Sequence, residues 1–306
     1  MLDEQVIDCR PGSSRGQSKS RCMIVDCHCH IFTSRIVENV SARHAMVAEL
    51  GLNVQGAGLR TDPRMLEESA SENNVDICLL LPTASPDRVR TENDRHMKFA
   101  SKHSRLTSLA TLHPFMDDMP GEIRRILEFG IKGFKFSSFS QRFELASREV
   151  EAMLLGIARI GREFGWVPVI ILDTFTRADI HFGADPGHLT RPETLMQLVQ
   201  RHPEINFVGS HMGGLTSEIS ELRRYLIPAP NLFLDTSNAA HTLHQSEFVD
   251  LLRIHGPGHI LFGTDWPWFH HSEEIPHIRC LLEKAGYNES DQDAVFGGNA
   301  RKLFGI

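Results

Sequence analysis

The sequence predicts an α/β protein folded as a closed (β/α)8 barrel, the TIM barrel. Short apolar runs recur along the chain, and longer segments with 3.6-residue spacing lie between them. No glycine-rich phosphate loop follows any of the runs, which weakens a nucleotide-binding fold. Alternation of this kind indicates parallel strands joined by right-handed crossovers. Eight such runs favour the barrel over its alternative, an open doubly wound sheet.

Each strand is predicted where apolar residues follow one another, and each helix where they recur on one face. The strands, in order, are Met23–Cys27, Asp76–Leu81, Leu106–Leu112, Lys132–Phe136, Val167–Leu172, Asn206–Ser210, Leu232–Asp235 and Ile260–Gly263. The helices include Glu122–Phe129, Ala152–Phe164, Pro192–Arg201, Ser217–Leu226, Phe248–His255 and His277–Ala285. Proline supplies both a start and a stop signal for one of them, because Arg191-Pro192 opens it and His202-Pro203 closes it.

Composition limits the class of protein. The chain has 306 residues, of which 41% are hydrophobic and 23% charged, as in an ordinary soluble globular protein. The net charge of −7 argues against a nucleic-acid surface, and no segment has the apolar length of a membrane span. The six cysteines, several of them within apolar runs, suggest buried reduced thiols in a cytoplasmic protein.

The chain is expected to form a flexible leader, residues 1–21, followed by a single barrel domain, residues 22–306. The leader has no apolar core of the kind found in a secretory signal. A long insertion, residues 31–75, follows the first strand and includes a helical stretch, Ile36–Leu50. This insertion is interpreted as a lid, as a subunit contact, or as a decoration without a role.

The most informative motif is Asp26-Cys27-His28-Cys29-His30, at the end of the first strand. Side chains alternate between the faces of a strand, so His28 and His30 are expected on one face and the two cysteines on the other. Two imidazoles converging from one strand end form half of a divalent metal site. The alternative is that both are polar residues at the mouth of a loop.

Other polar residues come at or just after the ends of later strands, where a barrel of this class places its active site. These residues are His113, Lys135, His211, Asn238 and Asp265. A polar residue at such a place can also cap the next helix or face solvent in a loop. That simpler explanation is weakest for His211 and Asp265, which follow the core runs Phe207–Ser210 and Leu261–Thr264 directly.

The chain resembles the amidohydrolase superfamily, in the branch related to aminocarboxymuconate-semialdehyde decarboxylase and pyrone dicarboxylate lactonase. The resemblance extends from about residue 22 to the C-terminus. The matching motifs, in order, are Asp26-x-His28-x-His30, Gly133-Phe134-Lys135, Phe207-Val208-Gly209-Ser210-His211-Met212-Gly213-Gly214, Phe262-Gly263-Thr264-Asp265-Trp266-Pro267 and Gly298-Asn299-Ala300-Arg301-Lys302-Leu303-Phe304.

The resemblance implies a role for each matching residue. His28, His30 and Asp265 would bind a divalent metal, with zinc the expected ion. His211 would act beside the activated water, and Asp265 would also accept a proton from it. Lys135, Asp173, Asn238 and Trp266 are candidate substrate-contacting or accessory residues.

One position departs from the family pattern. Members of the family usually end the fifth strand with a histidine ligand, whereas Leu172 occupies that position in Pro168-Val169-Ile170-Ile171-Leu172-Asp173. Asp173 is expected on the opposite face unless a bulge or an early strand end turns it inward. His181 and His188, in the loop that follows, are the other candidate replacements.

The function implied is a metal-dependent hydrolase that acts on a small, cyclic or carboxylated substrate. The alternatives are a metal-free, lactonase-like hydrolase, a non-oxidative decarboxylase, and a barrel that only binds a ligand. Lys135 suits a carboxylate substrate. The aromatic loop Trp266–His271 either walls the substrate or packs against the rim. A homodimer is compatible with the resemblance.

Overall fold

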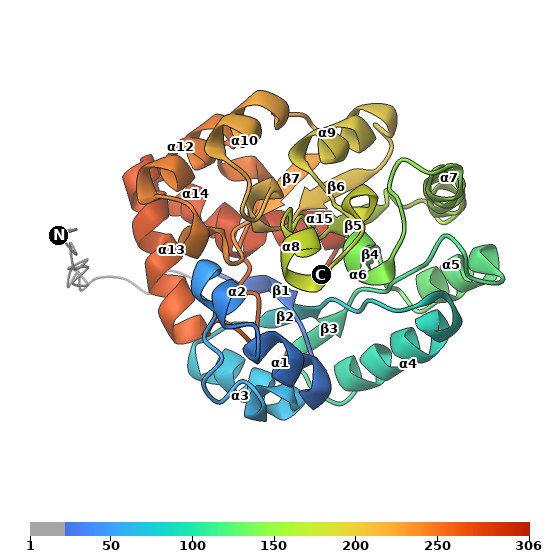
Figure 1. The fold of residues 1–306 in the computed structure, drawn as a ribbon, viewed down its shortest axis with the longest axis horizontal. Coiled ribbons are helices and arrows are strands. Elements are labelled where there is room, and N and C mark those ends of the chain that lie inside the picture. Colours follow the sequence, from blue (N-terminus) through green and yellow to red (C-terminus); the bar gives the residue numbers. More distant parts are fainter. Residues whose placement is uncertain (1–21) are drawn as a thin grey trace.

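The computed structural model describes residues 22–306, so the predicted leader lies outside the described residues. The strands occupy the middle of the molecule and the helices surround them (Figure 1). The strands are β1 (Val25–Cys29), β2 (Ile77–Leu80), β3 (Leu106–Ser108), β4 (Gly133–Phe136), β5 (Val169–Leu172), β6 (Asn206–Gly209), β7 (Leu232–Asp235) and β8 (Ile260–Leu261).

The helices alternate with the strands along the chain. They are α1 (Ser34–Ser41), α2 (His44–Glu49), α3 (Pro63–Glu72), α4 (Val89–Ala100), α5 (Met119–Glu128), α6 (Ser138–Gln141), α7 (Arg148–Glu163), α8 (Ala178–Phe182), α9 (Pro192–Arg201), α10 (Ile219–Tyr225), α11 (Ala239–Thr242), α12 (Gln245–His255), α13 (His271–Ala285), α14 (Glu289–Asp293) and α15 (Asn299–Phe304). The short helical turns are η1 (Leu59–Thr61), η2 (Pro86–Arg88), η3 (Pro186–His188), η4 (His211–Gly213), η5 (Pro257–His259) and η6 (Ala294–Gly298).

All the paired strands run parallel, in two sheets with the orders β1-β2-β3 and β4-β5-β6-β7-β8. Backbone hydrogen bonds join the two sheets at both seams. The Cys27 amide donates to the Phe262 carbonyl (2.8 Å), and the Lys135 amide donates to the Ala110 carbonyl (2.8 Å). Isolated parallel bridges, Cys29 with Trp266 and Ala110 with Phe134, lie at the same seams. The predicted (β/α)8 arrangement is confirmed.

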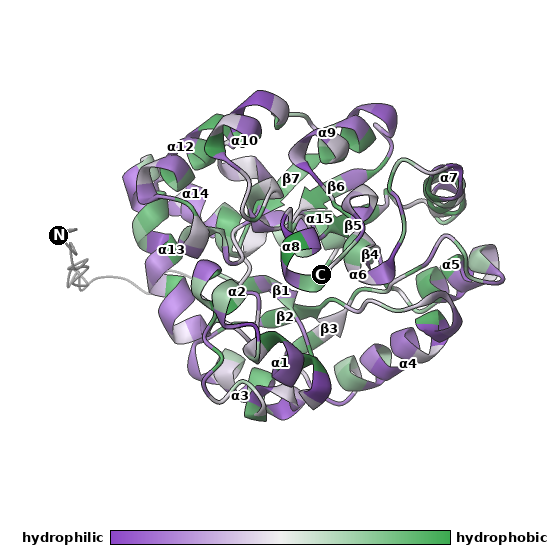
Figure 2. Ribbon diagram, in the orientation of Figure 1, coloured by the Kyte–Doolittle hydropathy of each residue, from purple (hydrophilic) through white to green (hydrophobic). Residues whose placement is uncertain are grey.

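Alternation along each strand divides the core into two layers. Inward side chains such as Val25, Val169 and Val208 pack with Phe304 of α15. Outward side chains such as Phe134 and Leu172 pack against the surrounding helices. The helices are correspondingly hydrophobic toward the strands and hydrophilic toward solvent (Figure 2). The inward face is therefore filled by apolar residues below the site and by polar residues at the strand ends.

The alternation is interrupted in β1. The register of β1 against β2 shifts between Asp26 and Cys29, as at a β-bulge. As a result Cys27 packs in the inner layer, whereas Cys29 packs in an outer cluster with Cys78 and Trp266. The expectation that both cysteines share one face is wrong, because the bulge changes the alternation between them.

Helix α4 was not predicted, and several predicted helices have other bounds in the structure, α13 most clearly. Helix α4 carries Val89, Asn93 and His96 on its buried face, so it shows no apolar periodicity in the sequence. Helix α13 begins at His271, ahead of the predicted start at His277, and continues through Pro276. Helix α9 has the predicted bounds.

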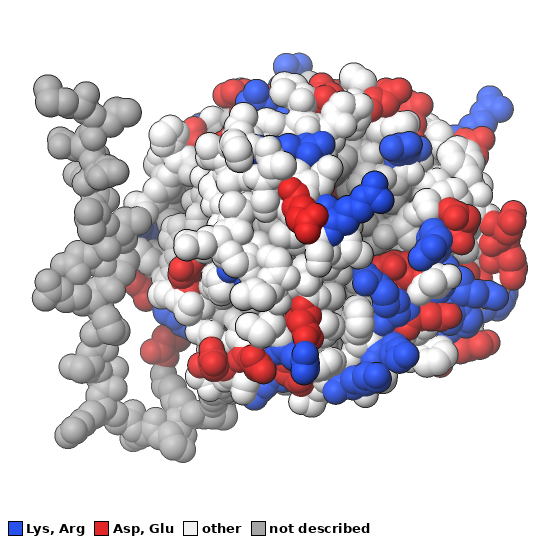
Figure 3. Space-filling model, turned by 60° about the horizontal axis from the view of Figure 1, so that its bottom comes forward, with Lys and Arg blue, Asp and Glu red and all other residues white. Residues whose placement is uncertain are grey.

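The insertion after β1 forms α1, α2 and α3, and the first two lie over one end of the barrel near β1 (Figure 1). None of the helices in the described part of the chain has the length and hydropathy to cross a membrane. On the face drawn in Figure 3, basic and acidic side chains are interspersed, and neither kind forms a continuous patch.

Candidate active site

Two histidines of β1 and its end meet at the centre of the site. The Nε2 atoms of His28 and His30 are 3.1 Å apart, and each lies 3.7 Å from Oδ1 of Asp265. His28 is fully buried, and His30 and Asp265 are nearly so. The three residues predicted as metal ligands are thus brought together at the seam between the β1 end and the β8 end.

The hydrogen bonds of the two imidazoles fix which nitrogen carries the proton. Nδ1 of His28 donates to Oδ2 of Asp235 (3.0 Å), and Nδ1 of His30 donates to the Leu81 carbonyl (3.1 Å). A carboxylate and a carbonyl can only accept, so this assignment of the protons follows from the partners. In the neutral imidazoles both Nε2 atoms then present lone pairs to each other.

This geometry fits a divalent metal. Two lone pairs 3.1 Å apart repel unless a cation lies beside them, and the Asp265 oxygen completes a three-cornered set around such a cation. The outer hydrogen bonds from Nδ1 to a carboxylate and a carbonyl are those that orient histidine ligands. His28, His30 and Asp265 are the residues that would hold the metal.

The charges in the site also favour a bound divalent cation. Burial, together with Asp173 and Asp235, raises the pKa of Asp265 well above its usual range. Burial lowers the pKa of Lys135, and the surrounding aspartates only partly offset this. The site thus gathers several carboxylates around one buried lysine, an imbalance that a divalent cation would relieve.

His211 is held ready to accept a proton. Its Nδ1 lies 2.9 Å from the Ser237 carbonyl, which can only accept, so the lone pair is on Nε2. Burial and the neighbouring His28 lower the pKa of His211 to about 4, so the ring is neutral near pH 7. Its backbone amide donates to Asp235 Oδ1 (2.9 Å), and that carboxylate therefore orients both His28 and His211.

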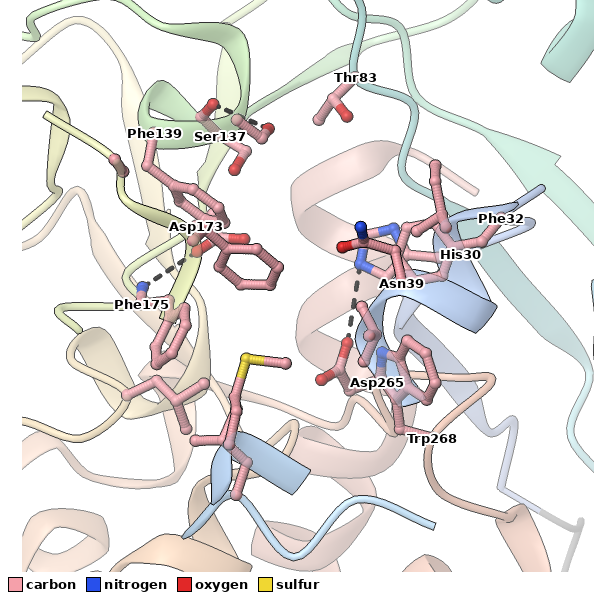
Figure 4. A pocket seen from close by; sticks show the side chains of 18 of the residues that line it. His30, Phe32, Asn39, Thr83, Ser137, Phe139, Asp173, Phe175, Asp265 and Trp268 are labelled. Carbon is pink, nitrogen blue, oxygen red and sulfur yellow. Dashed lines mark hydrogen bonds and ion pairs between the residues drawn. The ribbon is translucent and has the colours of Figure 1, made fainter. Parts of the chain in front are cut away.

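The fifth strand alternates regularly, and the expectations for both Leu172 and Asp173 are wrong: Leu172 does not face the site, and Asp173 does. Leu172 faces outward and packs in the layer between strands and helices. Asp173 continues the inward series of Val169 and Ile171 and lines the pocket without any bulge. Figure 4 shows Asp173 across the pocket from His30 and Asp265. It is not among the ligand-type atoms clustered around His28.

The other candidates are distributed differently. Asn238 and His188 line the pocket. His181 instead pairs with Glu49 (2.8 Å), and His113 is tied to the Gln141 carbonyl (2.8 Å). Trp266 does not reach the pocket: it is buried in the outer cluster, and its indole nitrogen donates to the Arg60 carbonyl (3.2 Å). The alternative reading of the aromatic loop, packing against the rim, holds for this residue.

The pocket has a volume of about 720 Å³ and opens beside the insertion. Aromatic side chains stand on both of its walls, with Phe32 and Trp268 on the side of His30, and Phe139 and Phe175 on the side of Asp173 (Figure 4). Helices α1 and α2 contribute Arg35, Ile36, Asn39, Val40 and Met46 to the lining. The insertion therefore forms part of the pocket wall.

Four pocket residues have backbone conformations that side chains rarely adopt, among them Arg142 with a φ of 61°. The φ angles of the other three, His211, Asn238 and Asp265, are 54°, 56° and 65°. Left-handed residues other than glycine cost about 1–3 kcal/mol each when tertiary structure holds them in place. Such residues cluster at functional sites, so this end of the barrel has the backbone character of one.

Several site residues were missed by the sequence analysis. Asp235 was recognised only as the end of a strand, although alternation from Phe233 would have turned it inward. Arg35 and Arg142 carry no signal in the sequence, because they reach the pocket from an insertion and from a loop. Trp268, by contrast, belongs to the aromatic loop that was expected either to wall the substrate or to pack against the rim, and it lines the pocket.

The fold and the site define a (β/α)8 enzyme barrel with its polar residues at the carboxyl ends of the strands. Residues 25–306 match the family model described as amidohydrolase. The chain belongs to the amidohydrolase family, and the prediction of an enzyme of that superfamily is confirmed. A search of curated proteins found no match.

Solved structures with the same fold include three that contain a bound metal ion or a bound small molecule. One is a 5-carboxyvanillate decarboxylase from Novosphingobium aromaticivorans with bound manganese and 3-methoxy-4-hydroxy-5-nitrobenzoic acid (15% identity, 93% of this chain and 97% of that chain, TM-score 0.66). Another is an amidohydrolase from Burkholderia multivorans with bound zinc (15%, 93% and 99%, TM-score 0.62). The third is a probable 2-pyrone-4,6-dicarboxylic acid hydrolase from Acinetobacter baumannii with bound citric acid (13%, 92% and 99%, TM-score 0.62). At these identities the likeness concerns the fold.

Proposed function

We propose that the protein is a metal-dependent hydrolase acting on a small, ring-bearing carboxylate. The observation that carries the proposal is the pair of Nε2 lone pairs of His28 and His30, 3.1 Å apart and both 3.7 Å from Asp265. Zinc and manganese, which two of the similar structures contain, are the candidate ions. A divalent cation bound there would supply Lewis-acid polarisation of a water molecule and of the substrate.

The side chains around the cation would divide the work. His211 accepts the proton of the attacking water at Nε2, because its Nδ1 is already committed to Ser237 and its pKa of about 4 keeps the ring neutral. Asp235 accepts from the His211 backbone amide at one oxygen and from the His28 ring at the other, and so holds both residues in position. Asp173, on the opposite wall, is placed to contact the substrate (Figure 4).

The charges of the pocket support a carboxylate substrate. Lys135 is a buried residue of the lining, and its Nζ donates a hydrogen bond to Ser210 Oγ (3.1 Å). Arg35 and Arg142 lie in the lining and have no ion pair with any residue between 22 and 306. Guanidinium groups without partners at a pocket are suited to bind carboxylates. The aromatic walls would stack on a planar ring.

Non-oxidative decarboxylation of the same class of substrate is the second candidate. The aromatic side chains of the lining favour this reaction, since they would hold a benzoate-like ring beside the cationic groups. If the protein were a metal-free hydrolase, its activity would not depend on metal. If it were only a binding protein, it would turn over no substrate. The buried free thiols Cys27, Cys29 and Cys78 support a cytoplasmic location. The homodimer stays a prediction.

Substitution of Asp265 tests the proposal. Asp265→Asn keeps the shape but removes the charged ligand, so we expect the turnover number to fall by at least about 10³-fold and the pocket metal to be lost. Lactones, cyclic amides and aromatic carboxylates are assayed for ring opening and for release of carbon dioxide, with metal content measured by elemental analysis. His44→Gln, an exposed change on α2, is the matched control. Full activity in Asp265→Asn would contradict the mechanism.

A further inference from the structure

A second group of ligand-type side chains lies outside the pocket, between α11 and α13. A ring nitrogen of His241, a carboxylate oxygen of Glu274 and a ring nitrogen of His277 all lie within 4.8 Å of one another. Glu274 and His277 are three residues apart on α13 and so share one face of that helix. His241 comes from the segment after β7, and its Nε2 is 2.8 Å from Oε1 of Glu274.

The glutamate of this group is incompletely satisfied. The side chain of Glu274 is only 1% exposed, and its Oε2 has no hydrogen-bond partner among the residues that the structure describes. A buried carboxylate oxygen without a donor is disfavoured, because it has lost its water and gained nothing in exchange. The unpaired oxygen is an open ligand position within the group.

The two histidines have the orientation and access that a ligand needs. The His241 ring stacks on Phe269, with centroids 4.2 Å apart and planes inclined by 13°, which restricts its rotation. The His241 and His277 rings are 5.5 Å apart and steeply inclined at 74°. The His241 side chain is 26% exposed, so a cation can reach the group from solvent. Two imidazoles and one carboxylate are a donor set suited to zinc and similar cations.

We propose that His241, Glu274 and His277 form a second divalent-metal site, with water completing the coordination. The site would join the segment that follows Asn238 to helix α13, which follows Trp268; both of these residues line the pocket. Phe269, which stacks on His241, is the direct neighbour of Trp268. A cation bound there would therefore hold together two segments that contribute residues to the pocket wall. This proposal is independent of the metal assigned to the pocket.

Zinc uptake by the metal-depleted full chain tests the site. We expect the native protein to bind two equivalents per chain, and Glu274→Gln and His277→Gln to bind one each. His44→Gln, an exposed histidine change elsewhere, should still bind two. Asp265→Asn should retain the equivalent held by His241, Glu274 and His277, so failure of the pocket site and failure of this site give different patterns. Unchanged uptake in both Glu274→Gln and His277→Gln overturns the proposal.

A thermal measurement covers the case in which one variant folds poorly. Zinc chloride should raise the melting temperature of Asp265→Asn in a concentration-dependent way, because a ligand that binds only the folded state stabilises it. The same addition should not shift the melting temperature of the double variant Asp265→Asn/His277→Gln. An equal shift in both proteins overturns the proposal.

Discussion

The two faces of β1, and of the residues that follow it, carry similar side chains. The hydrogen-bonding atoms are paired on the outer face, whereas lone pairs stay unused on the inner face. His28 and His30 on the inner face meet Asp265, and Asp26 and Cys29 on the outer face meet Cys78 and His271. Both groups are buried, and both contain the side chains from which metal sites are made. They differ in whether the ligand atoms already have partners.

On the outer face the carboxylate and the imidazole are fully occupied. Asp26 accepts from the His28 amide (2.9 Å) and the Thr264 amide (3.0 Å) at one oxygen, and from Thr264 Oγ1 (2.5 Å) and His271 (3.0 Å) at the other. The remaining nitrogen of His271 bonds to Ser69 (2.9 Å). On the inner face the Nε2 atoms of His28 and His30 have, among residues 22–306, no partner within hydrogen-bond distance except each other. Unused lone pairs, more than residue types, therefore mark where a cation belongs.

The largest effect that would sharpen this contrast is expected for Asp26→Ala. The change leaves the partners of a buried carboxylate without an acceptor, so the free energy of unfolding should fall by about 3–5 kcal/mol. Activity should fall as well, because Asp26 holds the backbone at His28 and at Thr264, next to Asp265. Urea denaturation measures the first effect. Asp87→Ala, on the surface, is the control and should change stability by no more than about 0.5 kcal/mol.

A loss of less than about 1 kcal/mol in Asp26→Ala would contradict the view that the outer face is a completed structural network.

A smaller effect is expected from pH. The hydrogen bond to Asp26 and the nearby Cys78 raise the pKa of His271 to about 10 against the opposing effect of burial. A raised pKa means that the folded state holds the proton more tightly than the unfolded state. The stability from this pair is complete below about pH 6.5 and is lost as the pH rises toward 10, by up to about 1.4 kcal/mol per pH unit.

Urea denaturation at pH 7 and pH 9.5 measures that slope, and His271→Gln should flatten it. A slope that is equally steep in the variant would assign it to other groups.

The smallest effect is expected for Cys78→Ala. Its Sγ lies 3.9 Å from Nε2 of His271, a weak contact, so the free energy of unfolding should fall by about 1 kcal/mol through lost packing. Zinc content should be unchanged, because the outer group needs no cation. Loss of one zinc equivalent in this variant would break the comparison and make the outer face a metal site too.

The sequence predicted the inner face better than the outer one. Alternation, with polar residues at strand ends, was enough to bring His28, His30, His211 and Asp265 together. The bulge that separates Cys27 from Cys29 could not be predicted, since no glycine or proline marks it. At β5 the strand does alternate, but the alternation was counted from the family position of Leu172. Leu172 was therefore expected inward and Asp173 outward, the reverse of what the structure shows.

The barrel was predictable because its strands are short apolar runs. The features that were missed do not show in a local pattern of apolar residues. Helix α4 buries Asn93, whose side chain bonds to Thr111 and to Glu122, so a polar residue occupies a core position. The pocket wall depends on α1 and α2, whose place over the barrel is set by tertiary packing and not by local pattern.

The seam between β8 and β1 has a consequence for synthesis of the chain. Asp26 and Thr264 are bonded to each other across 238 positions of the sequence, beside His28 and Asp265. A ribosome adds residues from the N-terminus, so the two histidines emerge long before their aspartate. We expect the chain to reach its full affinity for metal only near the end of translation, and shortened chains that stop before Asp265 to be inactive.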